Sequence, residues 1–163
     1  MSNDTEIKDK VREDVYDEEL LNRLLDGNDI DQFRDEFLAM HNYDQSEYFE
    51  DTDDNNRQKI FEFLSPKEVA NFFDQLDIDD EDYEELFDKI NANYASHVLE
   101  EMSYDNSVDI LNKLSKSKVA SLLTLMDKDE ANEIKALLHY EEDTAGGIMT
   151  TEYISLKSTT PVK

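Results

Sequence analysis

Residues 95–114 read ASHVLEEMSYDNSVDILNKL, and they contain two copies of one pattern. In each copy, apolar residues stand three, four and seven positions after a start residue, which is Ala95 in the first copy and Ser107 in the second. The apolar residues are Val98, Leu99 and Met102, then Ile110, Leu111 and Leu114. These spacings place side chains on one face of an α-helix.

The same pattern extends outward in both directions from this stretch. Its start residues are twelve positions apart, except for one step of fourteen at the acidic insert 79–82. The full set of starts is Arg57, Val69, Tyr83, Ala95, Ser107 and Val119. A weaker match begins at Ala131 and a partial one at Gln45. A regular internal period of this kind is typical of helical repeat proteins.

The residue that follows each apolar triplet is one that accepts hydrogen bonds from the first turn of a helix. The six residues are Ser65, Asp77, Asn91, Ser103, Ser115 and Asp127. We expect each of them to be a helix N-cap. Glu68, three residues after Ser65, completes a capping box, and Pro66 occupies the first helical position, where proline is best tolerated.

The sequence therefore predicts an all-α protein, a superhelix of helices that each span two to three turns, about 12–15 Å. Helices this short are unstable alone in water, so they must stack their apolar faces on their neighbours. The pattern does not determine the hand of the superhelix. Residues 1–28 are acidic with a weaker apolar pattern, and we expect them to form a loosely attached N-terminal segment.

Composition excludes several classes of function. With 42 acidic and 16 basic residues, the net charge of −26 disfavours nucleic acid and anionic membranes as partners. There is no cysteine, no motif for nucleophilic catalysis and no apolar stretch long enough to span a bilayer. We expect no enzyme activity and no direct membrane insertion. The charge alone is equally compatible with a surface that only maintains solubility.

The repeat stops after Leu138. Residues 139–150 contain two of the three glycines, adjacent to each other, and predict a turn or junction. Residues 153–156 then read as one short strand with no partner in the sequence. We expect this sequence to be cut shortly after a second domain begins.

Residues 141–153, EEDTAGGIMTTEY, resemble the junction between the N domain and the first CBS (cystathionine-β-synthase) domain of MgtE-type magnesium transporters and channels. Residues 64–68 and 99–105 are similar to the repeat units of that family. The resemblance covers residues 30–163. It divides the chain into an acidic segment 1–28, a superhelical N domain 29–140, and a junction with the beginning of a CBS domain at 141–163.

The resemblance implies a regulatory domain on the cytoplasmic face of the cell membrane. Its partners would be the CBS domains and the transmembrane pore of the same polypeptide. The full-length protein would be a homodimer, whereas we expect this fragment to be a soluble monomer. Magnesium (Mg²⁺) bound with low affinity between the N domain and the CBS domains would neutralise facing carboxylates and favour the closed pore.

Two aspartates are candidate magnesium ligands. Asp105 matches an acidic, metal-linked position of the family, and Asp109 follows one helical turn later on the same face. Carboxylates are the protein ligands that magnesium uses while it retains water. An alternative interpretation of Asp105 is that its charge stabilises the helix N-terminus. Asn106 and Asn71 stand where the family often has acids, which puts one interface site in doubt.

Three further acids, Glu141, Glu142 and Asp143, precede the glycine pair and are candidate metal ligands at the domain junction. They could equally form a solvated, charged hinge. The rival interpretation of the whole chain is an acidic helical scaffold that binds a basic protein partner without specific ion sensing. Such a scaffold would respond to ionic strength, and a sensor would respond to magnesium at constant ionic strength.

Overall fold

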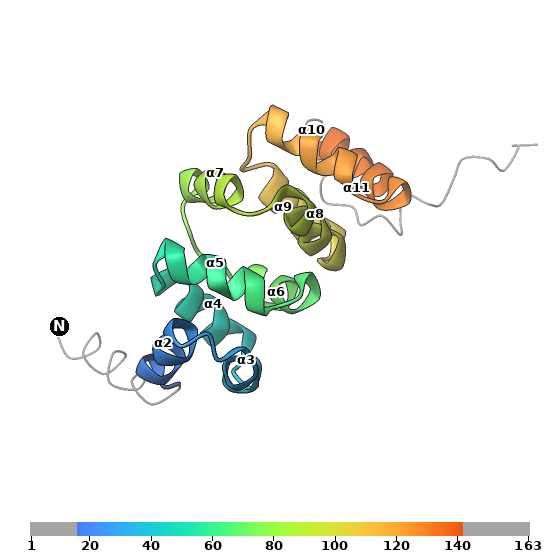
Figure 1. The fold of residues 1–163 in the computed structure, drawn as a ribbon. Coiled ribbons are helices and arrows are strands. Elements are labelled where there is room, and N and C mark those ends of the chain that lie inside the picture. Colours follow the sequence, from blue (N-terminus) through green and yellow to red (C-terminus); the bar gives the residue numbers. More distant parts are fainter. Residues whose placement is uncertain (1–15, 142–163) are drawn as a thin grey trace, which may run out of the picture. The chain divides into compact units, whose positions relative to one another are not determined.

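The computed structural model describes residues 16–141, and these residues form ten α-helices with no β-strand (Figure 1). The helices are α2 (Glu18–Asp26), α3 (Ile30–Leu38), α4 (Asn42–Asp51), α5 (Asp54–Phe63), α6 (Pro66–Phe73), α7 (Asp80–Lys89), α8 (Ala92–Glu101), α9 (Tyr104–Leu111), α10 (Lys116–Leu125) and α11 (Lys128–Glu141). The predicted all-α fold of short helices is confirmed. The predicted junction and start of a CBS domain lie outside the described residues.

The chain divides into two compact units, Met1–Asp77 and Ile78–Lys163. The first contains α2 to α6 and the second contains α7 to α11. The division falls next to the acidic insert 79–82, where the twelve-residue period has its only step of fourteen. The irregular step in the repeat therefore coincides with the boundary between the units.

Capping residues explain where the helices begin. The side chains of Asn91, Ser103 and Ser115 each accept a hydrogen bond from the backbone N–H three residues later. Ser65 and Glu68 form the predicted capping box, with Pro66 as the first residue of α6. The Asp127 carboxylate accepts from the backbone N–H of Asp129 at 2.9 Å. Five of the six predicted caps therefore act at helix starts.

The sixth predicted cap, Asp77, is wrong. Helix α7 begins at Asp80, its N-cap is Asp79, and the Asp79 side chain makes no capping hydrogen bond. The insert moves the helix start two residues along the chain. Acidic side chains at 80, 81 and 82 interact favourably with the positive end of the helix instead.

Aromatic side chains dominate the core of the first unit. Phe33 and Phe37 of α3 stack with ring centroids 5.2 Å apart, and Phe37 meets Phe72 of α6 edge to face at 5.6 Å. Phe49 of α4 lies 5.5 Å from Phe72. Helix α4 packs against α6, and α2 packs against α3 and α5. Large, rigid rings let helices of eight to ten residues bury enough apolar area to remain folded.

Helix α2 differs from the expectation of a loosely attached N-terminal segment. Leu21, Leu24 and Leu25 are buried, and Tyr48 donates a hydrogen bond from its hydroxyl to the side-chain oxygen of Asn22 at 2.7 Å. The leucine spacing is that of an apolar helical face, so the acidity of the flanking residues does not prevent packing. Residues 18–26 belong to the first unit, and residues 1–15 lie outside the described part.

The second unit has a mainly aliphatic core and a regular packing order. Helix α8 packs against α9 and α10, and α9 packs against α11. Each of α8 and α9 thus contacts the helix two positions later in the chain. This order buries residues such as Val98, Leu99 and Ile134. It is the stacking that a short helical repeat requires to bury its apolar face.

Candidate functional site

Helix α9 holds the two candidate aspartates. Its buried side consists of Ser107, Val108, Ile110 and Leu111, so the opposite side faces solvent. Asp105 and Asp109 are both exposed on that side, one turn apart. The Ser107 hydroxyl donates to the backbone oxygen of Leu99 at 2.6 Å, which fixes α9 against α8. The predicted placement of both carboxylates on one helix face is confirmed.

Acidic side chains of α11 lie near Tyr104, the first residue of α9. A hydrogen bond to the Glu130 carboxylate raises the pKa of Tyr104 to about 12, with burial and the nearby charges of Glu133 and Asp129 acting in the same direction. Tyr104 is the residue directly before Asp105, and α9 packs against α11. Negative charge from α11 is therefore close to Tyr104 at the N-terminal end of α9.

The described residues do not form a complete metal site by themselves. No group of three or more histidine or acidic side chains within 16–141 is arranged to hold a metal ion. The role of Asp105 and Asp109 as magnesium ligands therefore stays a prediction. Magnesium binds well with one or two protein carboxylates and several waters, so a pair of aspartates fits its chemistry.

The three junction acids fall at the edge of the described region. Glu141 is the last residue of α11, while Glu142 and Asp143 lie outside the described residues. Their role as ligands therefore stays a prediction. Asn71 and Asn106, which replace family acids, are on α6 and α9.

Sequence reasoning missed a structural use of other acids. The Glu50 carboxylate accepts the backbone N–H of Asp77 at 2.7 Å, and the Glu100 carboxylate accepts that of Asp127 at 2.7 Å. Both glutamates directly follow an apolar pair of their helix, but nothing in the repeat says which backbone group each would contact. Burial raises the pKa of Glu50, and the Asp77 N–H opposes that shift. These two acids join helices and are not part of the exposed candidate site.

Glu84 of α7 makes a third contact of this type. Its carboxylate accepts the backbone N–H of Ser115 at 2.8 Å, and this bond lowers the pKa of Glu84. Lys118 of α10 lies beside Glu84 and also pairs with Asp88. Lys89 and Lys113 also form ion pairs with acids of α7, and no described basic residue forms one with Asp105 or Asp109.

A domain of short, capped helices that stack in this order belongs to the class of helical-repeat proteins. Residues 40–143, more than half of the chain, match the family described as the MgtE intracellular N domain. The chain belongs to this family.

Similar proteins agree with this assignment. The chain is 42% identical over 144 residues to a magnesium transporter MgtE of Enterococcus faecalis, covering 88% of this chain and 32% of that protein. It is 23% identical over 147 residues to a magnesium transporter MgtE of Bacillus subtilis, covering 88% of this chain and 32% of that protein. The chain thus spans about a third of the length of these relatives.

Two solved structures share the fold. One is the crystal structure of the soluble part of a magnesium transporter, with a TM-score of 0.76 and 43% identity, covering 82% of this chain and 52% of that one. The other is the cytosolic domain of the Mg²⁺ channel MgtE in complex with ATP, with a TM-score of 0.67 and 26% identity, covering 80% of this chain and 53% of that one. Within residues 16–141, no helix has the length and apolar character needed to cross a membrane.

Proposed function

We propose that this chain is the cytosolic regulatory domain of a magnesium transporter or channel and that it senses intracellular Mg²⁺. The main support is the family match over residues 40–143, together with the relatives described as magnesium transporters. The partners would be the CBS domains and membrane pore of the same polypeptide, in a homodimeric full-length protein on the cytoplasmic face of the membrane. This fragment would be monomeric and without enzyme activity.

The proposed mechanism is an electrostatic switch. Asp105 and Asp109, with Glu141, Glu142 and Asp143 at the junction, would face carboxylates of a CBS domain. Without magnesium the facing acids repel one another, and the domain stays undocked. Bound magnesium neutralises them and favours the docked state, which closes the pore. The population shift can be no larger than the difference in magnesium affinity between the docked and undocked states.

Ion flux through the full-length protein in vesicles tests this function. We expect flux to fall as magnesium rises on the side that holds this domain, and we expect Asp105→Asn with Asp109→Asn to shift that inhibition to higher magnesium. Asp31→Asn is the matched control, because Asp31 is also an exposed aspartate at the second position of a helix, α3. Equal inhibition in all three proteins would contradict the assigned site.

The second candidate is an acidic scaffold for a basic protein partner, which the net charge of −26 favours. The scaffold predicts that inhibition, or any docking, follows ionic strength whichever salt supplies it. Replacing magnesium with sodium chloride at equal ionic strength separates the two functions. Equal inhibition of ion flux by sodium chloride and by magnesium at the same ionic strength would favour the scaffold.

A further inference from the structure

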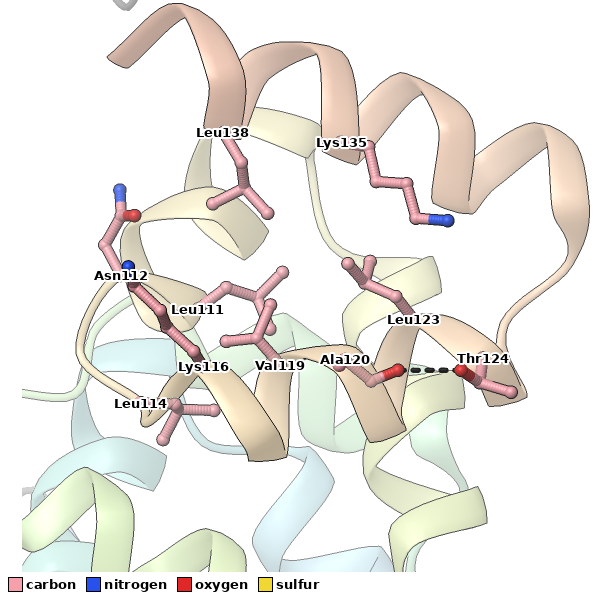
Figure 2. Close-up of a pocket in the computed structure, with 10 residues that line it drawn as sticks. All are labelled: Leu111, Asn112, Leu114, Lys116, Val119, Ala120, Leu123, Thr124, Lys135 and Leu138. Atoms are coloured by element: carbon pink, nitrogen blue, oxygen red, sulfur yellow. Dashed lines mark hydrogen bonds between the residues drawn. The ribbon is translucent and has the colours of Figure 1, made fainter. Parts of the chain in front are cut away.

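A groove of about 790 Å³ lies between α10 and α11 in the second unit (Figure 2). The apolar residues of its lining are Leu111, Leu114, Val119, Ala120, Leu123 and Leu138. Figure 2 shows Leu138 and Lys135 projecting from α11 towards Val119 and Leu123 of α10. Val119 and Leu138 are only half-buried, and Ala120 is exposed. The groove therefore presents apolar surface that the described residues leave uncovered.

The charge around this groove is opposite in sign to the charge of the chain. Residues 110–126, which include α10, are the longest stretch of the sequence without an aspartate or glutamate, in a chain with a net charge of −26. Lys116 of α10 and Lys135 of α11 belong to the lining, which contains no acidic residue. Positive charge therefore stands next to apolar surface at this one place in an acidic chain.

Both lysines of the lining are available to a ligand. Each is exposed, and neither has an acidic residue three or four positions away on its own helix. Within residues 16–141 no acid forms an ion pair with either of them, whereas Lys89 and Lys118 pair with acids of α7. An ammonium group beside an uncovered apolar surface suits a ligand that joins an anionic group to an apolar chain.

We propose that the groove binds a small anionic amphiphile, a carboxylate on an unbranched apolar chain. Its volume is within the range of about 300–1,000 Å³ that is typical of small-molecule sites with a mostly apolar lining and a few polar groups. The ten residues of α10 give it a length of about 15 Å, which suits a chain of medium length. A protein partner fits less well, because stable interfaces use about 20–30 residues a side and ten residues line this groove.

Isothermal titration calorimetry of the whole 163-residue chain with decanoate, in buffer without magnesium, tests the proposal. We expect one decanoate to bind per chain, and decylammonium, which has the same apolar chain, to bind about tenfold more weakly or less. The comparison is stringent because the net charge of −26 attracts the cation. No binding of decanoate, or binding of decylammonium that is equal or tighter, would overturn the proposal.

Substitution of the two lysines locates the anionic group. We expect Lys116→Gln with Lys135→Gln to weaken decanoate binding about threefold or more. Lys67→Gln with Lys128→Gln is the matched control, because it changes the net charge equally at two exposed lysines that do not line the groove. Equal weakening by both pairs of substitutions would overturn the proposal, since only the total charge would then matter.

A charge placed in the lining locates the apolar chain. We expect Ala120→Asp to weaken decanoate binding about tenfold or more, whereas Ser121→Asp, on the next exposed residue of α10 and outside the lining, leaves it unchanged. Circular dichroism checks that both variants keep their helix content. Equal affinities in the two variants would contradict the assigned groove. A dimer of the ligand-free chain that Ala120→Asp disperses in analytical ultracentrifugation would also overturn the proposal, because a second copy would then occupy the groove.

Discussion

At the scale of single residues, Glu68 joins α3 to α6. Its carboxylate accepts two hydrogen bonds from the Arg34 guanidinium, at 2.7 and 2.5 Å, and one from the backbone N–H of Ser65 at 2.8 Å. Arg34 also donates to the backbone oxygen of Phe63 at 2.9 Å. The Arg34 hydrogen bonds hold the pKa of Glu68 below its usual value of 4.5. The Glu68 side chain therefore completes the capping box with Ser65 and also forms an ion pair with Arg34.

Because the pKa of Glu68 is depressed in the folded state, its stabilisation is fully present above the unfolded value near 4.5 and is lost as the pH falls through the lower folded value. We expect Glu68→Gln to lower the free energy of unfolding by about 1–2 kcal/mol at pH 7. The difference from the natural protein should shrink below pH 4.5. Urea unfolding at several pH values measures it, with the exposed Glu62→Gln as control. An equal deficit at pH 7 and at low pH would contradict the assigned ion pair.

Glu100 offers a second test at this scale. Its side chain is only 18% exposed and accepts the Asp127 N–H, so it fixes the loop before α11. We expect Glu100→Ala to lower the free energy of unfolding by about 1 kcal/mol, since the hydrogen bond between α8 and the loop before α11 is lost. Glu101→Ala, an exposed neighbour, should change it by less than about 0.5 kcal/mol. Equal urea midpoints for the two variants would show that the contact contributes nothing.

At the scale of the element, the twelve-residue repeat determines which residue of each helix is buried. Leu99, at the fourth position of its repeat, is 0% exposed, whereas Leu125, outside the pattern in α10, is 40% exposed. Both are leucines in helices of ten residues. A comparison of the two positions therefore separates the effect of burial from the effects of residue type and helix propensity.

We expect Leu99→Ala to lower the free energy of unfolding by about 2–5 kcal/mol, because it removes buried methyl groups and leaves a cavity. Leu125→Ala should cost less than about 1 kcal/mol. Thermal or urea unfolding of the two variants compares them directly. A larger loss for Leu125→Ala would mean that the repeat frame is misassigned.

Most helix starts and buried helix faces could be predicted from the sequence, since apolar spacing and capping side chains act within a single helix. The start of α7 could not, because the step of fourteen residues leaves two acidic candidates, Asp77 and Asp79, and the chain uses the later one. The packing of α2 into the first unit was not predicted, because acidic residues surround its short apolar face of leucines in the sequence. The contact from Glu100 to Asp127 depends on packing between separate helices, which no local pattern describes.

At the scale of the whole molecule, the dominant property is a net charge of −26. The predicted position of Asp105 and Asp109 on one face of α9 is confirmed, and the structure shows that both are exposed. The predicted ligands Asp105, Asp109, Glu141, Glu142 and Asp143 stay a prediction, because helical spacing relates residues of one helix and does not say which other carboxylates approach them. The local charge near Tyr104 comes from α11 and likewise depends on tertiary packing.

The central claim is that magnesium, rather than ionic strength, docks this domain through its acidic face. Limited proteolysis of the full-length protein over a magnesium titration, with sodium chloride adjusted to constant ionic strength, tests it most directly. We predict that magnesium slows cleavage between this domain and the rest of the protein and that Asp105→Asn with Asp109→Asn moves the midpoint to higher magnesium, while Asp31→Asn leaves it in place. Cleavage that is independent of magnesium at constant ionic strength would contradict the claim.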